Sequence, residues 1–210
     1  MMSSNLESTL LSVLSPGEGN LPATLRTRLA DDAEAAEILD VAYRTIDTHI
    51  GTLLIAATDR GLVRVAFEVQ GHDQALEDLA TRVSPRILRA PRRLDTAARE
   101  IEEYLIGRRA AFDLPLDLRL AAGFRREVLH HLPDIHSGQT ASYAAMATAV
   151  GNPRAVRAVG TACAMNPLPL VIPCHRVVRS DGTIGQYAGG APAKQTLLAL
   201  ERSSAALQAT

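Results

Sequence analysis

Residues 151–160, Gly-Asn-Pro-Arg-Ala-Val-Arg-Ala-Val-Gly, decide the fold of the second half of this chain. Ser142 can cap a helix that runs up to this stretch, and the leading glycine suits the left-handed position that follows a helix. Asn152 is a good N-cap and Pro153 a good first helical residue, so a second helix is expected from here to about Ala164. Two short helices joined by so tight a turn predict a helix-turn-helix motif.

The chain around this motif divides into three parts and has an α+β fold class. Residues 119–210 are mostly helical, with one more helix expected over 123–132 before Pro133. Residues 38–118 predict a small antiparallel sheet with helices. Residues 1–37 lack a sustained period and are expected to be a partly disordered or weakly helical extension. In the sheet domain the strands are expected at 38–46, 52–58, 62–67 and 112–116, and the helices at 74–83 and 94–106.

The composition is that of a soluble globular protein, because 47% of the 210 residues are hydrophobic and 21% are charged. No apolar run is long enough to cross a bilayer, and the first residues lack the pattern of a secretory signal. The two cysteines, Cys163 and Cys174, cannot form a disulfide framework, which favours a reducing, cytoplasmic setting. They cannot form a cysteine-only zinc site, and no His pair at ligand spacing joins them, so no metal is expected.

Charge is divided unevenly along the chain. Residues 119–210 hold 9 Lys and Arg against 4 Asp and Glu, a net charge of +5. Residues 1–118 hold 13 against 19, a net charge of −6. A basic second part fits a nucleic-acid surface, but a chance segregation of solvated charges explains the same pattern equally well.

The stretch Pro167–Val178, Pro-Leu-Pro-Leu-Val-Ile-Pro-Cys-His-Arg-Val-Val, carries the clearest chemistry. A cysteine reacts as its thiolate, and a base or cation nearby raises the thiolate fraction. His175 and Arg176 follow Cys174 directly, but neighbouring side chains of an extended segment point to opposite sides. From the residues alone, a reactive Cys174 and a buried structural thiol are equally open.

Within that stretch, residues 172–177 resemble the active-site signature of the methylated-DNA–protein-cysteine methyltransferases, the O6-alkylguanine-DNA alkyltransferases. The resemblance continues in the family's order and spacing over residues 120–202, and more loosely over 38–118. The segments that carry it are Ser142-Tyr143, 151–160, Asn166-Pro167, 187–190 and 197–201 in the second part, and 46–51 and 104–118 in the first.

The resemblance implies a role for five residues in alkyl transfer. Cys174 would accept the alkyl group, and His175 would act as its base through a water. Glu201 would orient that histidine, which is the arrangement of a base held by a third group. Tyr143 would transfer a proton to the departing base, and Asn166 would fix the turn before the active-site segment.

The resemblance also implies binding of alkylated double-stranded DNA in the minor groove, with the damaged base extruded from the duplex. Arg157 would fill the gap that the base leaves. Small residues, Ala155 and Ala158 together with Ala162, would keep the second helix narrow enough to approach the groove. Tyr143 also belongs to this surface, and Arg154 and Arg125 are candidate phosphate contacts.

The pocket for the alkylated base would be formed by residues around the active-site cysteine. Ala188 stands where many family members have Ser, and Cys163 could be either an apolar wall or a second, slower acceptor. The pocket residues implied by the resemblance are Cys163, Pro169, Val177, Tyr187, Ala188 and Gly189.

The resulting hypothesis is a suicide enzyme for direct-reversal DNA repair, acting once on O6-alkylguanine and on O4-alkylthymine. It would be monomeric and would need no cofactor, metal or membrane. One alternative is an alkyltransferase-like protein that only recognises lesions, but such proteins lack the acceptor cysteine. Another is a cysteine hydrolase, which would leave the helix-turn-helix unexplained.

Overall fold

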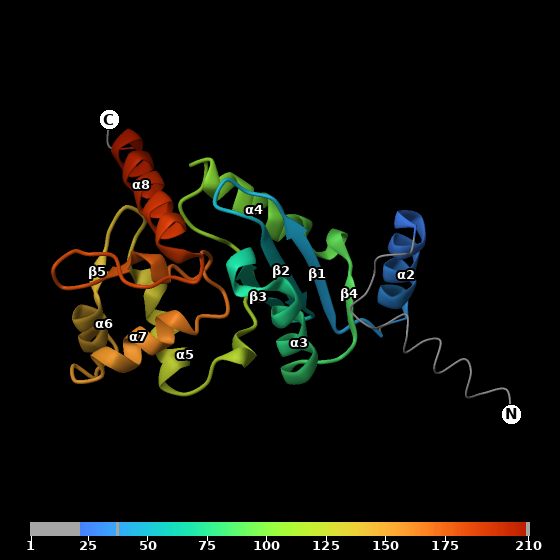
Figure 1. Cartoon of the computed structure of the whole chain (residues 1–210), viewed down its shortest axis with the longest axis horizontal. Coiled ribbons are helices and arrows are strands. Elements are labelled where there is room, and N and C mark those ends of the chain that lie inside the picture. The colour runs from blue at the N-terminus through green and yellow to red at the C-terminus, as the bar shows by residue number, and fades with distance from the viewer. Residues whose placement is uncertain (1–21, 37, 209–210) are drawn as a thin grey trace, which may run out of the picture. The chain divides into compact units, whose positions relative to one another are not determined.

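The computed structural model describes residues 22–36 and 38–208, which divide into two compact units at residues 39 and 40. The first unit contains helix α2 (Ala23–Ala35). The rest of the extension expected at 1–37, namely 1–21 and 37, lies outside the described residues. The second unit, from residue 40 onward, contains every other element in Figure 1.

The second unit begins with the expected antiparallel meander, β1 (Val41–Ile46), β2 (Leu53–Thr58) and β3 (Gly61–Phe67). A fourth strand, β4 (Ile87–Arg89), pairs parallel with β1 and completes the order β3-β2-β1-β4. All six residues of β2 are buried, as expected for a central strand.

The strand predicted at 112–116 is wrong. Only Leu116 forms a bridge, to Leu62, and the amide of Leu62 donates to the Pro115 carbonyl at 2.8 Å. Pro115 has no backbone N–H to continue a ladder, which explains why the pairing stops at one bridge.

Helices α3 (His72–Arg82) and α4 (Asp95–Leu105) belong to the same domain as this sheet and lie at the two predicted positions. α3 buries Ala75 and Leu79 in one hydrophobic core cluster. α4 buries the side chain of Tyr104, which is 1% exposed. The other members of that core cluster are Val41, Leu54, Ala56, Val63, Ala66 and Leu120.

The mostly helical second part contains α5 (Phe124–His131), α6 (Tyr143–Ala149), α7 (Val156–Ala164) and α8 (Gly190–Gln208), of which α5, α6 and α7 lie together (Figure 1). Two short strands, β5 (Ala141–Ser142) and β6 (Val177–Val178), pair in parallel beside them. The single-turn 3-10 helices of the unit are Glu68–Gln70, Pro91–Leu94, Leu118–Leu120, Leu132–Asp134 and Cys174–Arg176. Within the described residues, no helix has the length and apolar character that a membrane span requires.

The two helices of the expected helix-turn-helix are α6 and α7, but the turn between them is longer than expected. Ser142 caps α6 by accepting from the amide of Ala145 at 3.0 Å, and Gly151 has the left-handed φ of 74°. The second helix begins at Val156 rather than at Asn152 or Pro153. The Asn152 carbonyl instead accepts from the amide of Ala155 at 2.9 Å, so these residues form an extra turn before the helix.

Candidate active site

Cys174 begins a buried 3-10 turn, Cys174–Arg176, that leads directly into β6. The loop before it doubles back tightly, because the amide of Ile172 donates to the Leu168 carbonyl at 2.8 Å. Leu170 in this loop has a φ of 77°, which is rare for a residue with a branched side chain. Such strain persists only where the surroundings fix the backbone, as they do here around the thiol.

The Asn166 side chain holds this loop on the thiol. Its Oδ1 accepts from the amide of Leu168 at 3.0 Å, and its Nδ2 donates to the Ile172 carbonyl at 2.9 Å. The same Nδ2 lies 3.2 Å from the sulfur of Cys174. Asn166 therefore fixes the position of the sulfur and donates one hydrogen bond to it.

The thiol of Cys174 is protonated at neutral pH. Burial raises its pKa to about 11, although the hydrogen bond from Asn166 acts in the opposite direction. A pKa four units above neutrality leaves only about one molecule in 10⁴ as thiolate at pH 7. Rapid reaction therefore requires a base that removes the proton during the attack.

His175, the residue after Cys174, is the candidate base on this turn. Its ring is fully buried, and its Nε2 lies 2.8 Å from Oε1 of Glu201. Burial lowers the pKa of His175, so the ring is neutral at neutral pH. Contact with a carboxylate assigns the ring proton to Nε2, which leaves a lone pair on Nδ1. Nδ1 is buried and has no hydrogen-bond partner among the described residues.

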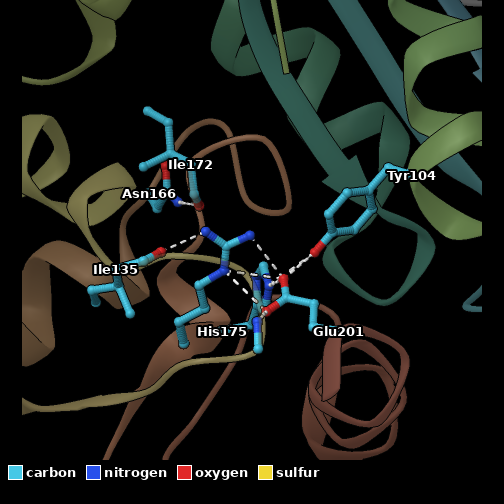
Figure 2. Close-up of polar contacts among 8 residues, drawn as sticks. Tyr104, Ile135, Asn166, Ile172, His175 and Glu201 are labelled. Carbon is cyan, nitrogen blue, oxygen red and sulfur yellow. Dashed lines mark hydrogen bonds and ion pairs between the residues drawn. The ribbon is translucent and has the colours of Figure 1, made fainter. Parts of the chain in front are cut away.

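Glu201 is the centre of the buried network that Figure 2 shows. Arg176 donates to both of its carboxylate oxygens at 2.9–3.1 Å, and the amide of Gly138 donates to Oε2 at 3.1 Å. The hydroxyl of Tyr104 donates to Oε1. Burial alone would raise the pKa of Glu201, but these donors and His175 lower it to about 2. The carboxylate is therefore charged throughout the physiological range.

Sequence reasoning missed three buried residues of this site. Tyr104 approaches from α4 in the sheet domain, with its hydroxyl 3.2 Å from Nε2 of His175, and Arg176 also donates to the Ile135 carbonyl at 2.6 Å. Lys194 is fully buried in α8 and donates to the Val177 carbonyl at 2.6 Å. Burial lowers the pKa of Lys194, and the nearby thiols of Cys174 and Cys163 oppose that effect.

One signal in the sequence could have found Lys194. It stands seven residues before Glu201, with Leu197 and Leu198 between them, so all four residues share one helix face. A lysine on an otherwise apolar helix face either has a role in the interior or shows that the face was assigned wrongly. Tyr104 had no such signal, because its partners are far away in the sequence.

Tyr143 opens α6 with a half-buried ring. Burial raises the pKa of its phenol, and the neighbouring Cys163 and Cys174 raise it further, so the hydroxyl keeps its proton. The ring packs against Gly185, where a Cβ atom would overlap the phenol oxygen. Tyr143 therefore lies beside the loop that follows β6.

That loop borders a cavity of about 480 Å³. Of the pocket residues expected from sequence, Tyr187 and Ala188 line this cavity. Cys163, Pro169 and Val177 are buried and do not line it, and Gly189 packs against the ring of Phe67. Arg179, Ile184 and Gly185 line it as well, although sequence reasoning did not select them. The Tyr187 ring stands edge-on to the rings of Phe67 and His175.

Cys163 belongs to the interior of α7 rather than to the cavity wall. Its side chain is 5% exposed, and burial together with Cys174 raises the pKa of its thiol to about 12. A thiol in that state is a poorer nucleophile at neutral pH than Cys174, whose hydrogen bond from Asn166 favours the thiolate.

The exposed side of α7 and of the turn before it carries most of the residues expected to contact DNA. Arg154, Arg157 and Ala158 are exposed, and Ala155 is half-buried. Ala162, expected on the same narrow side, is 1% exposed and packs into the core instead.

Arg125 differs from the other expected phosphate contacts. Its Nη2 donates to the Leu120 carbonyl at 2.9 Å, and its Nη1 lies 3.6 Å from the sulfur of Met165. The side chain is half-buried in a small cavity rather than extended into solvent.

Two family models match the chain and together span most of the second unit. Residues 41–118 match the ribonuclease-like domain of 6-O-methylguanine DNA methyltransferase, and residues 123–203 match the DNA-binding domain of the same family.

Characterised proteins are similar over the same region. A methylated-DNA–protein-cysteine methyltransferase of Mycolicibacterium paratuberculosis is 40% identical over 162 residues, which cover 77% of this chain and 93% of that protein. The bifunctional transcriptional activator/DNA repair enzyme Ada of Escherichia coli is also 40% identical, over 79% of this chain and 46% of Ada. Among solved structures, Mycobacterium tuberculosis OGT in complex with DNA superposes with a TM-score of 0.69 at 34% identity, covering 78% of this chain and 94% of that one.

Proposed function

The chain belongs to the methylated-DNA–protein-cysteine methyltransferase family, and we propose that it transfers an alkyl group from O6-alkylguanine in duplex DNA to its own Cys174. The observation that carries this proposal is the placement of two hydrogen-bonded pairs on one buried turn, Asn166 with the sulfur of Cys174 and His175 with Glu201. This turn combines a buried thiol with a neutral base whose orientation is fixed.

The attack forms a bond between the sulfur of Cys174 and the alkyl carbon and breaks the bond from that carbon to O6. The electron pair of the broken bond stays on the guanine. The thiol proton leaves to Nδ1 of His175, through one water, while Glu201 holds the opposite side of the ring. Hydrogen bonds from Arg176 and Tyr104 keep the pKa of Glu201 low, so that carboxylate orients the histidine without taking its proton.

The guanine that leaves must not carry a full negative charge, so it needs a proton donor. Tyr143 suits this role because its phenol is protonated and lies beside the loop that borders the cavity. With the proton from Tyr143 replaced by the one taken from Cys174, the products are an S-alkylcysteine and a neutral guanine. No hydrolytic step regenerates the thiol, so each molecule reacts once.

DNA is the partner that the family and its structural relative support, and α7 is the surface that we propose for it. A base that is paired in a duplex must leave the stack to reach a buried thiol. Arg157 is exposed and long enough to fill the gap, and Ala155 and Ala158 let the helix approach a minor groove. Arg154 would bind a phosphate. O4-alkylthymine, which presents a similar exocyclic ether, is proposed as a second substrate.

The proposal is tested by the stoichiometry of the reaction. The full chain is incubated with excess duplex DNA that carries radiolabelled O6-methylguanine, and label on the protein is counted over time. Label should reach one methyl group per protein molecule and then stop. Continued loss of methyl groups from DNA without labelled protein would contradict the proposal and would favour a hydrolase.

The matched control is O6-methylguanine as the free base. It reaches the same thiol without any DNA contact, so the proposed site should react with it slowly but detectably. A protein that reacts with neither substrate would lack the proposed activity.

A further inference from the structure

A small cavity of about 160 Å³, different from the one beside Tyr187, is bordered by three arginines. Arg64 comes from β3, Arg82 from the last turn of α3, and Arg125 from the first turn of α5. Asp78 is the acidic residue on its border, so three Arg and one Asp give a formal charge of +2. The sequence indicates a phosphate contact for Arg125 alone, and the function proposed above uses none of the three arginines.

Two of these arginines are held close together without a carboxylate. Nη2 of Arg82 and Nη2 of Arg125 donate to the same carbonyl, that of Leu120, at 3.0 and 2.9 Å. Two guanidinium groups on one oxygen repel each other, although Arg82 is exposed and Arg125 is half-buried. Asp78 forms no ion pair with any of the three among the described residues.

Arg64 is the least satisfied of the three. Its half-buried side chain makes no hydrogen bond or ion pair with the described residues, and its Nε is buried without an acceptor. The Nε of Arg125 is in the same condition. Burial lowers the pKa of Arg64, the charge of Asp78 opposes that effect, and the charge of Arg82 adds to it.

Folded proteins rarely leave a partly buried charge unpaired, because its desolvation costs free energy that a partner normally offsets. Arg176 in the same molecule follows this rule, with Glu201 and Ile135 as its acceptors. The three arginines of this cavity do not follow it, because they lack a negatively charged partner in the part of the chain that the structure describes.

We propose that this cavity is a binding site for an oxyanion of the phosphate class. Guanidinium groups match the geometry of phosphate oxygens, and three of them from different elements surround one small space. A water takes up about 30 Å³ in the liquid, so a cavity of about 160 Å³ has the volume of several waters and room for one tetrahedral oxyanion. Arg64, Arg82 and Arg125 are its ligands.

The phosphate has two possible sources. Ala164 and Met165, where α7 ends, also border the cavity, so a backbone phosphate of DNA on α7 is one source. Free phosphate is the other. The DNA source rests on the DNA contacts proposed above, whereas the free-phosphate source is independent of them.

The first experiment measures binding of inorganic phosphate to the full chain, by calorimetry and by thermal unfolding at constant ionic strength. Phosphate should raise the unfolding temperature of the wild type. The Arg64→Met variant should bind phosphate at least tenfold more weakly, and Arg64→Lys should retain most of the binding. The control is Arg202→Met, which removes an exposed arginine of α8 and should bind phosphate like the wild type.

Heat stability in phosphate-free buffer distinguishes anion binding by Arg64 from a purely structural role. Removal of an unpaired charge should leave Arg64→Met at least as heat-stable as the wild type, so that the two proteins differ only when phosphate is present. If Arg64→Met is destabilised equally with and without phosphate, Arg64 is a packing residue and the site does not exist.

The second experiment measures binding to an undamaged duplex over a range of salt concentrations. If a DNA phosphate occupies the cavity, Arg64→Met should weaken binding about tenfold and reduce the salt slope by about one. An unchanged slope together with free-phosphate binding assigns the site to a small anion. An unchanged slope without phosphate binding overturns the proposal. Because neither readout uses alkyl transfer, a failure of the proposed function would be seen separately.

Discussion

The interior around Cys174 and the exposed side of α7 use charged residues in opposite ways. Arg176 is 6% exposed and donates to both oxygens of Glu201, and His175 is held by the same carboxylate. Arg154 and Arg157 on the exposed side project into solvent, with no side-chain hydrogen bond or ion pair to the described residues.

This difference separates the chemistry from the recognition. The interior residues contact one another without DNA, so the site should also act on a free alkylated base, although slowly. The exposed residues gain partners only when DNA binds, so they should matter only for duplex. Variants of the two regions should therefore fall into two classes, those that affect both substrates and those that affect duplex alone.

The largest effect is expected for Cys174→Ser. The hydroxyl is a far weaker nucleophile, so transfer should fall by about 10⁴-fold or more on duplex and free base alike. Duplex binding should be unchanged. The control is Cys163→Ser, which should transfer at close to the wild-type rate in a single-turnover assay. Residual transfer to Cys163 in Cys174→Ser would show that the second thiol is a slow acceptor.

The His175→Gln variant should lose about 10²–10⁴-fold in single-turnover rate, the usual contribution of a general base. The pH profile distinguishes this role from a structural one. The pKa of Cys174 is raised to about 11, so the variant should speed up about tenfold per pH unit up to that value. The wild type should be nearly flat around neutral pH, because the pKa of His175 is lowered and the base is already neutral. A flat profile in the variant would argue against general-base catalysis.

The Glu201→Gln variant should lose about 3–5 kcal/mol of unfolding free energy, because Arg176 then remains buried without a counter-charge. Acid unfolding supplies a second readout. The pKa of Glu201 is about 2 in the folded protein and 4.5 ordinarily, so its contribution is complete above 4.5 and is lost as the pH falls toward 2. That pKa difference amounts to about 3 kcal/mol at 1.36 kcal/mol per unit, a contribution that the variant lacks. Equal acid sensitivity in both proteins would show that the network is not coupled to folding.

The smallest effects belong to the exposed region. Arg157→Ala should slow transfer from duplex by about 10- to 100-fold, corresponding to roughly 1–3 kcal/mol of stabilisation of the extruded base. Transfer from free O6-methylguanine should not change. Arg154→Ala is the matched variant, since it removes one phosphate contact only and should lower the salt slope of duplex binding by about one. A loss on the free base in either variant would break the division between the two regions.

Much of this fold follows from local sequence. The meander is marked by β-branched runs and by a turn at 59–61, and α6 by its cap at Ser142. Strand β4 was missed because it has only three residues and lies between Pro85 and Pro91. The start of α7 was placed too early because Asn152 and Pro153 favour both a helix start and a turn, and only the tertiary fold selects the turn.

The candidate site was less accessible to sequence. Cys174, His175 and Glu201 were found through resemblance, and the structure pairs His175 with Glu201 at 2.8 Å. The partners of Tyr104 lie 71 and 97 residues away, so no local pattern reveals them. The catalytic roles of Cys174, His175 and Glu201 are proposals for experiment, and so is the division of the chain near residue 118.

Peptide mass analysis of the spent protein shows directly whether Cys174 itself receives the alkyl group. After reaction with duplex containing O6-methylguanine, we expect one added methyl group on the peptide that contains Cys174 and none on the peptide that contains Cys163. A methyl group on any other residue, or an unmodified protein alongside repaired DNA, would contradict it.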